Sequence, residues 1–349
     1  MKSADFIKNH NQSSPDFTLS LYKTEADFAK LAEISMAQAT LPWAFPGLTT
    51  EEFHQNFKNL INCDLTRDLL IVEEGNHPVA YFRVSWQDTA AVPERLFFVG
   101  GRMNPSIYGK GVHELMLNWA FVRIHELSLE HPTDRLIMVN HQVNQRDLAQ
   151  LAVVKSMGFT PRHHYFEMRR DLENIPSYSL PEGVTVRPAF QHEYQHVFNQ
   201  GIDAFRDHYG FAESWANYQE WLEEPQFQPW LWQLAWHGNE NIGQVLNYIE
   251  HGENERTNHL RGYTENISVI RKWRSKGIAK ALVCRSMEMF KALGMKEVVL
   301  FVDASSPTGA LHLYENLGYQ VFKTMVDYVK PLQDEPFTSE CAACQPGTK

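Results

Sequence analysis

Apolar positions along the chain follow two periods, which predict strands and helices in a recurring order. Alternating or continuous apolar runs predict strands, and apolar residues three and four apart predict helices. The predicted strands are residues 17–22, 97–103, 136–139, 184–190, 265–269, 297–302 and 319–322, with hairpins at 68–84 and 230–246. The predicted helices are residues 24–34, 114–127, 144–157 (with its leading turn), 192–205, 278–293 and 310–317. Strands that alternate with helices in this way predict an α/β fold.

The same plan occurs twice along the chain. The strand and helix at 17–34 match those at 184–205, and the hairpin at 68–84 matches the one at 230–246. The offset is roughly 165 residues, far beyond the period of a solenoid repeat, so it indicates two copies of one domain.

Composition then suggests boundaries for the two copies. Residues 1–16 are polar and predicted to be loose, and 17–172 form the first predicted domain. Residues 173–182 carry prolines and small polar residues typical of a linker. Residues 183–333 form the second predicted domain, and 334–349 a flexible tail.

A basic loop joins a predicted strand to a predicted helix in the second copy. Arg274, Lys276 and Gly277 lie between the strand at 265–269 and the helix that begins at Ile278. Free N–H groups in a first helical turn and the helix dipole favour negative charge, and glycine lets a ligand approach the backbone closely. The sequence therefore predicts an anion site here.

Two motifs around this loop resemble those of the GCN5-related N-acetyltransferase (GNAT) superfamily. Arg-Ser-Lys-Gly-Ile-Ala at 274–279 resembles its pyrophosphate-binding motif, Gln/Arg-x-x-Gly-x-Gly/Ala. Leu-Tyr-Glu-Asn-Leu-Gly-Tyr at 313–319 resembles the family's later Leu-Tyr-Glu-x-Leu-Gly-Phe/Tyr element. The resemblance covers residues 262–322. It implies two tandem domains, each a mixed, mostly antiparallel sheet flanked by helices, with a splayed strand pair that admits the cofactor.

The resemblance also implies acetyl transfer from acetyl-CoA to a primary amine in the second domain. Tyr314 stands where the family has its general acid, and Glu265 is a candidate base. Ser306 and Pro307 stand where many relatives carry an asparagine that contacts the pantetheine. The residues implied to bind the cofactor are Ile267, Ser268, Val269, Arg274, Ser275, Lys276, Gly277, Ile278, Ala279, Lys280, Ser306, Ala310 and Tyr314.

An unusually dense group of aromatic residues lies between the first helix and the hairpin of the second copy. Core packing explains most of it, but relatives form their acceptor pocket in this region. The candidate substrate residues are Phe205, Asp207, Tyr209 and Trp215. No metal site is expected, because His163 and His164 have no third ligand at metal spacing.

The first copy departs from the cofactor motif. Gly111 aligns with Gly277, but Tyr108 stands at the arginine position and His113 at the alanine position. An imidazole there would occupy the space in which a pyrophosphate must approach the backbone. The first copy is therefore predicted to be catalytically degenerate.

Charge and cysteine content narrow the setting. The net charge is −10, which argues against a general nucleic-acid partner. No run approaches the length of a membrane span and no signal core is present, so a cytoplasmic protein is expected. Cys63 and Cys284 are interpreted as small hydrophobes, and Cys341 and Cys344 as part of the tail.

Three functions stay open from the sequence. The first is an N-acetyltransferase acting on a small-molecule amine. The second is the same reaction on a protein N-terminus or lysine. The third is a sensor that binds acyl-CoA without turnover. A monomer or a homodimer would fit any of them.

Overall fold

The computed structural model describes residues 1–13, 16–89, 92–205, 215–304 and 309–332. The strands are β1 (Thr18–Leu21), β2 (Leu69–Glu74), β3 (His77–Asp88), β4 (Glu94–Met103), β5 (Leu136–Asn144), β6 (Thr160–Asp171), β7 (Val184–Val186), β8 (Gln233–His237), β9 (Glu240–Tyr248), β10 (Arg261–Val269), β11 (Glu297–Asp303) and β12 (Gln320–Pro331). The helices are α1 (Ser3–Ser13), α2 (Phe28–Gln38), α3 (Thr50–Phe57), α4 (Leu65–Asp68), α5 (Val112–Glu130), α6 (Leu148–Ser156), α7 (Tyr194–Phe205), α8 (Trp215–Glu223), α9 (His251–Thr257), α10 (Ile278–Ala292) and α11 (Ala310–Asn316).

All of these strands belong to one sheet. Their order is β1-β2-β3-β4-β5-β12-β6-β11-β10-β9-β8-β7. The β4–β5 and β10–β11 pairs are parallel, and the other neighbours are antiparallel. The predicted α/β class, with a mixed and mostly antiparallel sheet flanked by helices, is confirmed.

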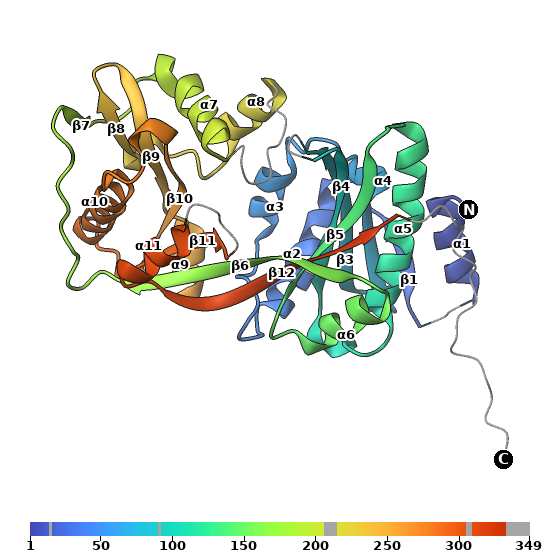
Figure 1. The fold of residues 1–349 in the computed structure, drawn as a ribbon. Coiled ribbons are helices and arrows are strands. Elements are labelled where there is room, and N and C mark those ends of the chain that lie inside the picture. The colour runs from blue at the N-terminus through green and yellow to red at the C-terminus, as the bar shows by residue number, and fades with distance from the viewer. Residues whose placement is uncertain (14–15, 90–91, 206–214, 305–308, 333–349) are drawn as a thin grey trace.

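The two halves of the chain exchange their last strands. β6 ends the first half, yet it pairs with β11 of the second half over Tyr165–Asp171. β12 ends the second half, yet it pairs with β5 of the first half over Met325–Pro331. β6 and β12 also pair with each other, and Figure 1 shows both strands running across the middle of the molecule. This exchange joins what would otherwise be two sheets. The proposed boundary at 173–182 stays a prediction.

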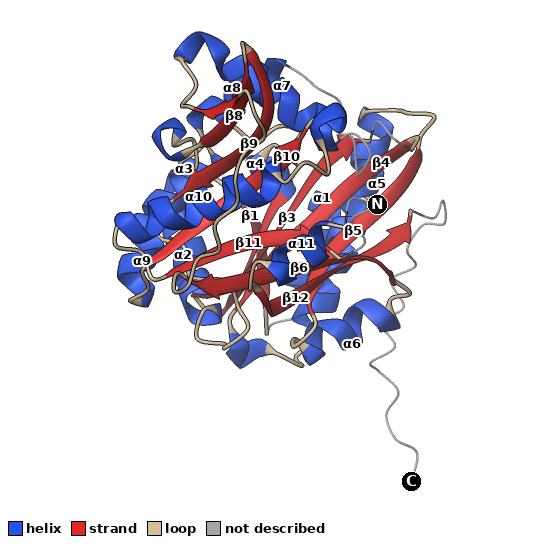
Figure 2. Ribbon diagram, turned by 60° about the vertical axis from the view of Figure 1, so that its left-hand side comes forward, coloured by secondary structure: helices blue, strands red, loops and turns tan. Residues whose placement is uncertain are grey.

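Each half buries an apolar helix against its own part of the sheet. α5 packs Leu117, Trp119 and Ile124 into the core of the first half. α10 packs Leu282, Met287 and Phe290 into the core of the second, and Figure 2 shows it lying across β9 and β10. Both helices begin at the end of the parallel strand that precedes them, so each core holds a strand–loop–helix turn in place.

The N-terminal residues differ from the prediction of a loose segment. Residues Ser3–Ser13 form α1, which lies beside α5 in Figure 1. Ser3 Oγ donates a hydrogen bond to Glu126 Oε2 at 2.6 Å, and Asn11 exchanges two hydrogen bonds with the backbone of Leu19. The prediction was wrong because these anchors are side-chain contacts with distant residues, which local polarity does not reveal.

No helix in the described part of the chain combines the length and the apolar character needed to cross a bilayer.

The strand exchange predicts that neither half folds well alone. A chain of residues 183–349 lacks β6 between β11 and β12, and a chain of residues 1–172 lacks β12 beside β5. Exposed edges of this kind promote aggregation. We expect each fragment alone to aggregate or to melt at a much lower temperature than the intact chain, and the two co-expressed fragments to assemble one to one. Size-exclusion chromatography and thermal unfolding followed by circular dichroism would measure this. A fragment of 183–349 that is monomeric and melts like the whole chain would contradict it.

Candidate active site

The basic loop that follows β10 has the backbone conformation of an anion site. A single 3-10 turn, Arg271–Trp273, leads into an extended Arg274 and then into Ser275 and Gly277, whose φ angles are 60° and 82°. Gly277 is the N-cap of α10, and a Cβ added there would meet no atom within 4 Å. The backbone at Gly277 is therefore open to close approach, and the N–H groups of the first turn of α10 have no intrahelical partner.

Lys272 of this loop pairs with Glu240 at 2.8 Å, but Arg274, Lys276 and Lys280 pair with no carboxylate in the described part of the chain. Arg274 Nε donates to the carbonyl of Val269 at 3.0 Å, which ties the loop to the end of β10. Lys276 lies over the ring of Trp273, and Lys280 lies near the ring of Tyr178. Within the described part of the chain, none of these three cations forms an ion pair, so their charge is available to an anion at the start of α10.

β10 separates from β11 halfway along its length. The two strands pair only over Arg261–Tyr263 and Glu297–Val299, although β10 continues to Val269 and β11 to Asp303. The pairing of β10 with β9 shifts register between Glu265 and Ser268, and Asn266 there has a φ of 45°. This β-bulge bends the end of β10 and leaves backbone groups of 266–269 without a strand partner on the β11 side. The predicted splayed pair is present.

Polar side chains from α7 and β9 support the bulge. Gln244 Nε2 donates to Asn266 Oδ1 at 3.1 Å, and Asn241 Nδ2 donates to Gln244 Oε1 at 3.1 Å. Ser268 Oγ donates to Gln200 Oε1 at 3.3 Å. Gly201 lets α7 approach so closely that a Cβ there would lie 2.7 Å from Asn266 Nδ2. These contacts from α7 and β9 therefore stabilise the bulge in the second half.

Tyr314 lies on α11, on the apolar side of the sheet. Its ring is buried beside Tyr319, with ring centroids 5.9 Å apart, in the core shared with α10. Burial raises its pKa, so the phenol keeps its proton at neutral pH and can donate it. Ala310 begins the same helix and is half-buried. Ser306 lies outside the described residues.

Glu265 faces a cleft of about 260 Å³ on the other side of the bulge. The cleft is lined by Trp221, Glu224, Gln226, Trp232, Leu246, Tyr248, Glu265 and Asn266. The Glu265 carboxylate reaches the solvent of the cleft but is otherwise enclosed by protein, and this desolvation raises its pKa. Among the described residues it has no hydrogen bond or ion pair.

Glu224 is a second carboxylate in this cleft, and sequence reasoning missed it. Desolvation, followed by the nearby negative charges of Glu265 and Glu220, raises the pKa of Glu224 to about 7. A carboxylate with such a pKa is suited to accept a proton near neutral pH. The dense aromatic stretch was a signal for this region. The approach of Glu224 to Glu265 depends on tertiary packing and has no sequence signature.

The four candidate substrate residues cannot be assigned to this cleft. Asp207 and Tyr209 lie outside the described residues, and only the backbones of Phe205 and Trp215 are described. Their roles stay predictions. The aromatic residues that do line the cleft are Trp221 and Trp232, whose rings stack with centroids 5.4 Å apart.

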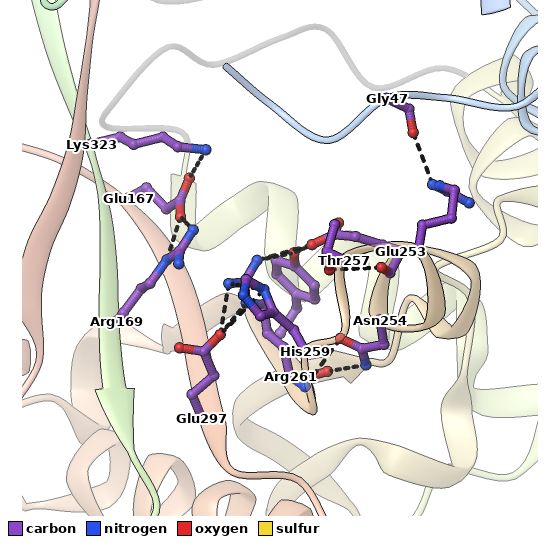
Figure 3. Close-up of polar contacts among 12 residues, drawn as sticks. Gly47, Glu167, Arg169, Glu253, Asn254, Thr257, His259, Arg261, Glu297 and Lys323 are labelled. Carbon is purple, nitrogen blue, oxygen red and sulfur yellow. Dashed lines mark hydrogen bonds and ion pairs between the residues drawn. The ribbon is translucent and has the colours of Figure 1, made fainter. Parts of the chain in front are cut away.

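A larger cleft of about 400 Å³ continues from the first, and Gln226 and Tyr248 line both. Its walls come from both halves of the chain, since Phe45 and Glu52 face Glu250 and Arg261 across it. At its floor Lys323 of β12 and Arg169 of β6 hold the buried carboxylate of Glu167, which is also on β6 (Figure 3). The strand exchange thus builds the floor of the cleft.

The first half repeats the loop backbone of the second almost residue for residue. A 3-10 turn, Pro105–Ile107, leads into extended Tyr108, and Gly109 and Gly111 have φ angles of 79° and 78°. Gly111 is the N-cap of α5, as Gly277 is of α10. The local chain path is therefore shared, and the two sites differ in side chains.

Those side chains fill the first site. His113 Nε2 and His141 Nε2 lie 2.9 Å apart in the buried space between α5 and β5. His141 Nδ1 donates to the carbonyl of Val99 at 2.9 Å, so its Nε2 accepts the hydrogen bond from His113. Tyr108 donates to Asp147 at 3.1 Å, linking the loop to the N-cap of α6.

The first half also lacks the bulge. β3 and β4 pair without a register shift from Ala80–Met103 to Asp88–Arg95. β4 and β5 stay paired over Glu94–Val99 and Leu136–His141, twice the length of the β10–β11 pairing. The strand pair of the first half is therefore more closed.

No metal centre accompanies these features in the described residues, where no group of three or more His, Cys, Asp or Glu side chains could hold an ion.

Comparison with known families matches the second half. The model of the acetyltransferase (GNAT) family matches residues 194–319. The chain is 34% identical over 100 residues to N-alpha-acetyltransferase MAK3 of Arabidopsis thaliana, a match that covers 29% of this chain and 50% of that protein. It is 32% identical over 69 residues to N-alpha-acetyltransferase 30 of Schizosaccharomyces pombe, covering 20% of this chain and 45% of that protein. The matches thus span about half the length of these relatives.

Comparison with solved structures extends over about nine-tenths of the chain. A GCN5-related N-acetyltransferase from Sphaerobacter thermophilus is similar with a TM-score of 0.71 and 23% identity, covering 91% of this chain and 96% of that one. A tandem GNAT protein from the clavulanic acid biosynthesis pathway has a TM-score of 0.69 and 12% identity, covering 92% and 100%. At these identities the similarity establishes the fold alone, which this chain shares with both proteins over about nine-tenths of its length.

The buried histidine pair predicts a pH-dependent stability. Burial lowers the pKa of His113, and it lowers that of His141 to about 4, so the unfolded chain takes up protons first as the pH falls below 6.5. The free energy of unfolding should be at its full value above pH 6.5. It should fall between pH 6.5 and about 4, by about 3 kcal/mol for His141 alone.

Urea unfolding at pH 7.5 and pH 5 measures this loss. A chain with His113→Gln and His141→Gln should lose less stability between the two pH values, whereas the exposed control His125→Gln should behave like the unaltered chain. An equal loss in all three would contradict the assignment.

Proposed function

Because residues 194–319 form a domain of the acetyltransferase (GNAT) family, we propose that this chain is an acetyl-CoA-dependent N-acetyltransferase with its active site in the second half. The single observation that supports this most is the loop–bulge arrangement. An open, cationic helix start at Gly277 lies next to a strand end, 266–269, that is unpaired on the side of β11. The first half has the same loop, but a buried His113 stands there at the position of Ala279.

The loop side of this site fits the diphosphate of coenzyme A. The N–H groups of 277–280 and the cations of Arg274, Lys276 and Lys280 would hold the phosphate oxygens. Ser275 and Ala279 complete the loop, and Ala279 adds only a methyl group where the first half has an imidazole. The unpaired backbone of Ile267, Ser268 and Val269 would bind the pantetheine amides as an added strand does. The backbone N–H near Val269 would stabilise negative charge on the thioester oxygen.

Two groups of the chain would move the protons. Acetyl-CoA, when bound, supplies the acetyl group as a thioester. Glu265, with Glu224 beside it, would accept the proton that the attacking ammonium must lose before its nitrogen forms the new C–N bond. Tyr314 would give its phenolic proton to the sulfur as the C–S bond breaks. Tyr314 is buried on the α10 side of the sheet, and Glu265 lines a cleft on the other side, so the splay between β10 and β11 connects them.

The proposed acceptor is a small molecule with a primary amine. The two adjoining clefts of about 260 and 400 Å³ have the size of small-ligand sites. A peptide N-terminus is the second candidate, because the two relatives with the sequence matches are named N-alpha-acetyltransferases.

Equivalent glycine substitutions in the two loops test the cofactor assignment. Gly277→Ala and Gly111→Ala place a methyl group at matched positive φ angles, so each should cost about 1 kcal/mol of stability. Only Gly277→Ala should weaken coenzyme A binding, at least tenfold, since its methyl group would enter the space of the diphosphate. Isothermal titration calorimetry on the full chain measures both. Weaker binding in Gly111→Ala, with Gly277→Ala unchanged, would place the cofactor in the first half.

Tyr314→Phe tests turnover against mere binding. Loss of the proton donor should lower kcat by about 10²–10³-fold. Affinity for coenzyme A should stay within about twofold, because the ring that packs in the core is retained. Thiol release from acetyl-CoA with an amine measures the rate. The matched control is Tyr319→Phe, a buried phenol 5.9 Å away by ring centroids. Unchanged turnover in Tyr314→Phe would remove the general acid and favour another donor.

A further inference from the structure

The basic and the acidic side chains that line the joined clefts differ in how many protein partners they have. The basic residues that line them already have protein partners. Arg256 binds Glu52 and the carbonyl of Gly47, and Arg261 binds Glu253 and Glu297. Arg102 donates to the carbonyl of Pro46 at 2.9 Å.

Lys323 completes this pattern. It binds Glu167 and donates to the carbonyl of Ala44 (Figure 3 draws its contact with Glu167). Among the described residues, Arg256, Arg261 and Lys323 therefore have carboxylate partners, whereas Arg102 binds only carbonyl oxygens.

In the described part of the chain, Glu224 and Glu265 have no cation beside them, and Glu250 forms no ion pair, although the nearby charge of Arg256 lowers its pKa in part. Glu224 and Glu265 have neither a hydrogen bond nor an ion pair, and Glu250 accepts only one hydrogen bond, from Gln226 Nε2 at 2.6 Å. Desolvation is the largest cause of the raised pKa at each of them, although Glu224 and Glu265 still reach solvent. A ligand with positive charge would offset the desolvation of these carboxylates.

These carboxylates form two groups on either side of one tyrosine. Tyr248 lines both clefts, and its own pKa is raised by burial and then by Glu265, with a further contribution from Glu250. Glu224 and Glu265 line the smaller cleft, and Glu250 the larger. A linear molecule that passes Tyr248 would meet negative charge at both ends.

Aromatic rings also line the path between the two groups of carboxylates. Tyr248 stacks on Tyr263 with ring centroids 4.9 Å apart, and Trp221 stacks on Trp232. All four rings line one of the two clefts. Stacked aromatic walls suit the methylene chain of an alkylamine, and their faces attract ammonium groups.

We propose that the acceptor is a linear diamine, or an amine with a second cationic group, lying along the joined clefts. Its reacting nitrogen is held at Glu224 and Glu265, and its second cation at Glu250. This inference rests on the proposed acetyltransferase function and adds the substrate class. Neutral or acidic amines and peptide N-termini that carry no second cation are the competing acceptors.

A set of acceptors with the same carbon chain tests the charge requirement. Thiol release from acetyl-CoA by the full chain is measured with four acceptors. They are 1,4-diaminobutane, 1-aminobutane, 4-aminobutanoate and a peptide that has a free N-terminus and uncharged side chains. One favourable ionic contact corresponds to about tenfold, so kcat/KM for the diamine should exceed that for 1-aminobutane at least tenfold. The acid should be poorer still, because its carboxylate would face Glu250.

A substitution then tests whether Glu250 binds the second cationic group of the acceptor. Glu250→Gln should raise KM for 1,4-diaminobutane about tenfold, leave kcat unchanged, and leave 1-aminobutane unaffected. The control Glu255→Gln changes an exposed carboxylate on the same helix, α9, and should alter neither acceptor.

Two further sets of outcomes would contradict either the proposed acceptor or the proposed function. If 1-aminobutane, 4-aminobutanoate or the peptide is as good as the diamine, or if Glu250→Gln affects both alkylamines equally, the dicationic acceptor is wrong while the acetyltransferase stands. If coenzyme A binds but no acceptor releases thiol, the proposed function fails and this inference fails with it.

Discussion

The structure of the second half depends on one break in backbone pairing. β10 and β11 part after three paired residues, because β10 bulges at Asn266 and turns toward β9 and α7. That break costs hydrogen bonds between the strands, so it persists only where other groups support it. Gln244 and Gln200 bind to the bulge, and Gly201 allows α7 to come close enough for this. The break frees strand backbone next to the start of α10. In the proposed reaction it would also connect the buried side of Tyr314 with the cleft of Glu265.

The two halves share one local chain path but differ in their strand pairing and in the side chains around the turn. The turns before α5 and α10 agree in their extended residue, in their positive φ angles and in their N-cap glycine. In the first half, the bulge is absent and two imidazoles hydrogen-bond to each other across the interior. Buried polar groups that satisfy one another in this way rigidify a core. We regard the first half as a structural partner that contributes walls to the larger cleft and strand β6 to its floor.

Sequence patterns predicted the features that depend on neighbouring residues. The α/β class, the hairpins, the duplication and the start of α10 at Gly277 follow from periodicity, turn residues and motif spacing, and the structure has them. The features that depend on distant residues were not predictable. The exchange of β6 and β12 cannot be recognised from the alternation of apolar and polar residues. That alternation is the same whichever strand lies beside them. The anchors of α1 and the approach of Glu224 to Glu265 likewise join residues far apart in the chain. The roles of Tyr314, Glu265 and the loop residues stay predictions.

A crystal structure of the full chain grown with saturating coenzyme A would test the central claim most directly. The account predicts the diphosphate against the N–H groups of residues 277–280 and the pantetheine along the freed end of β10, with the His113–His141 contact intact in the first half. Coenzyme A bound at the Tyr108–His113 turn, with the second loop empty, would contradict it.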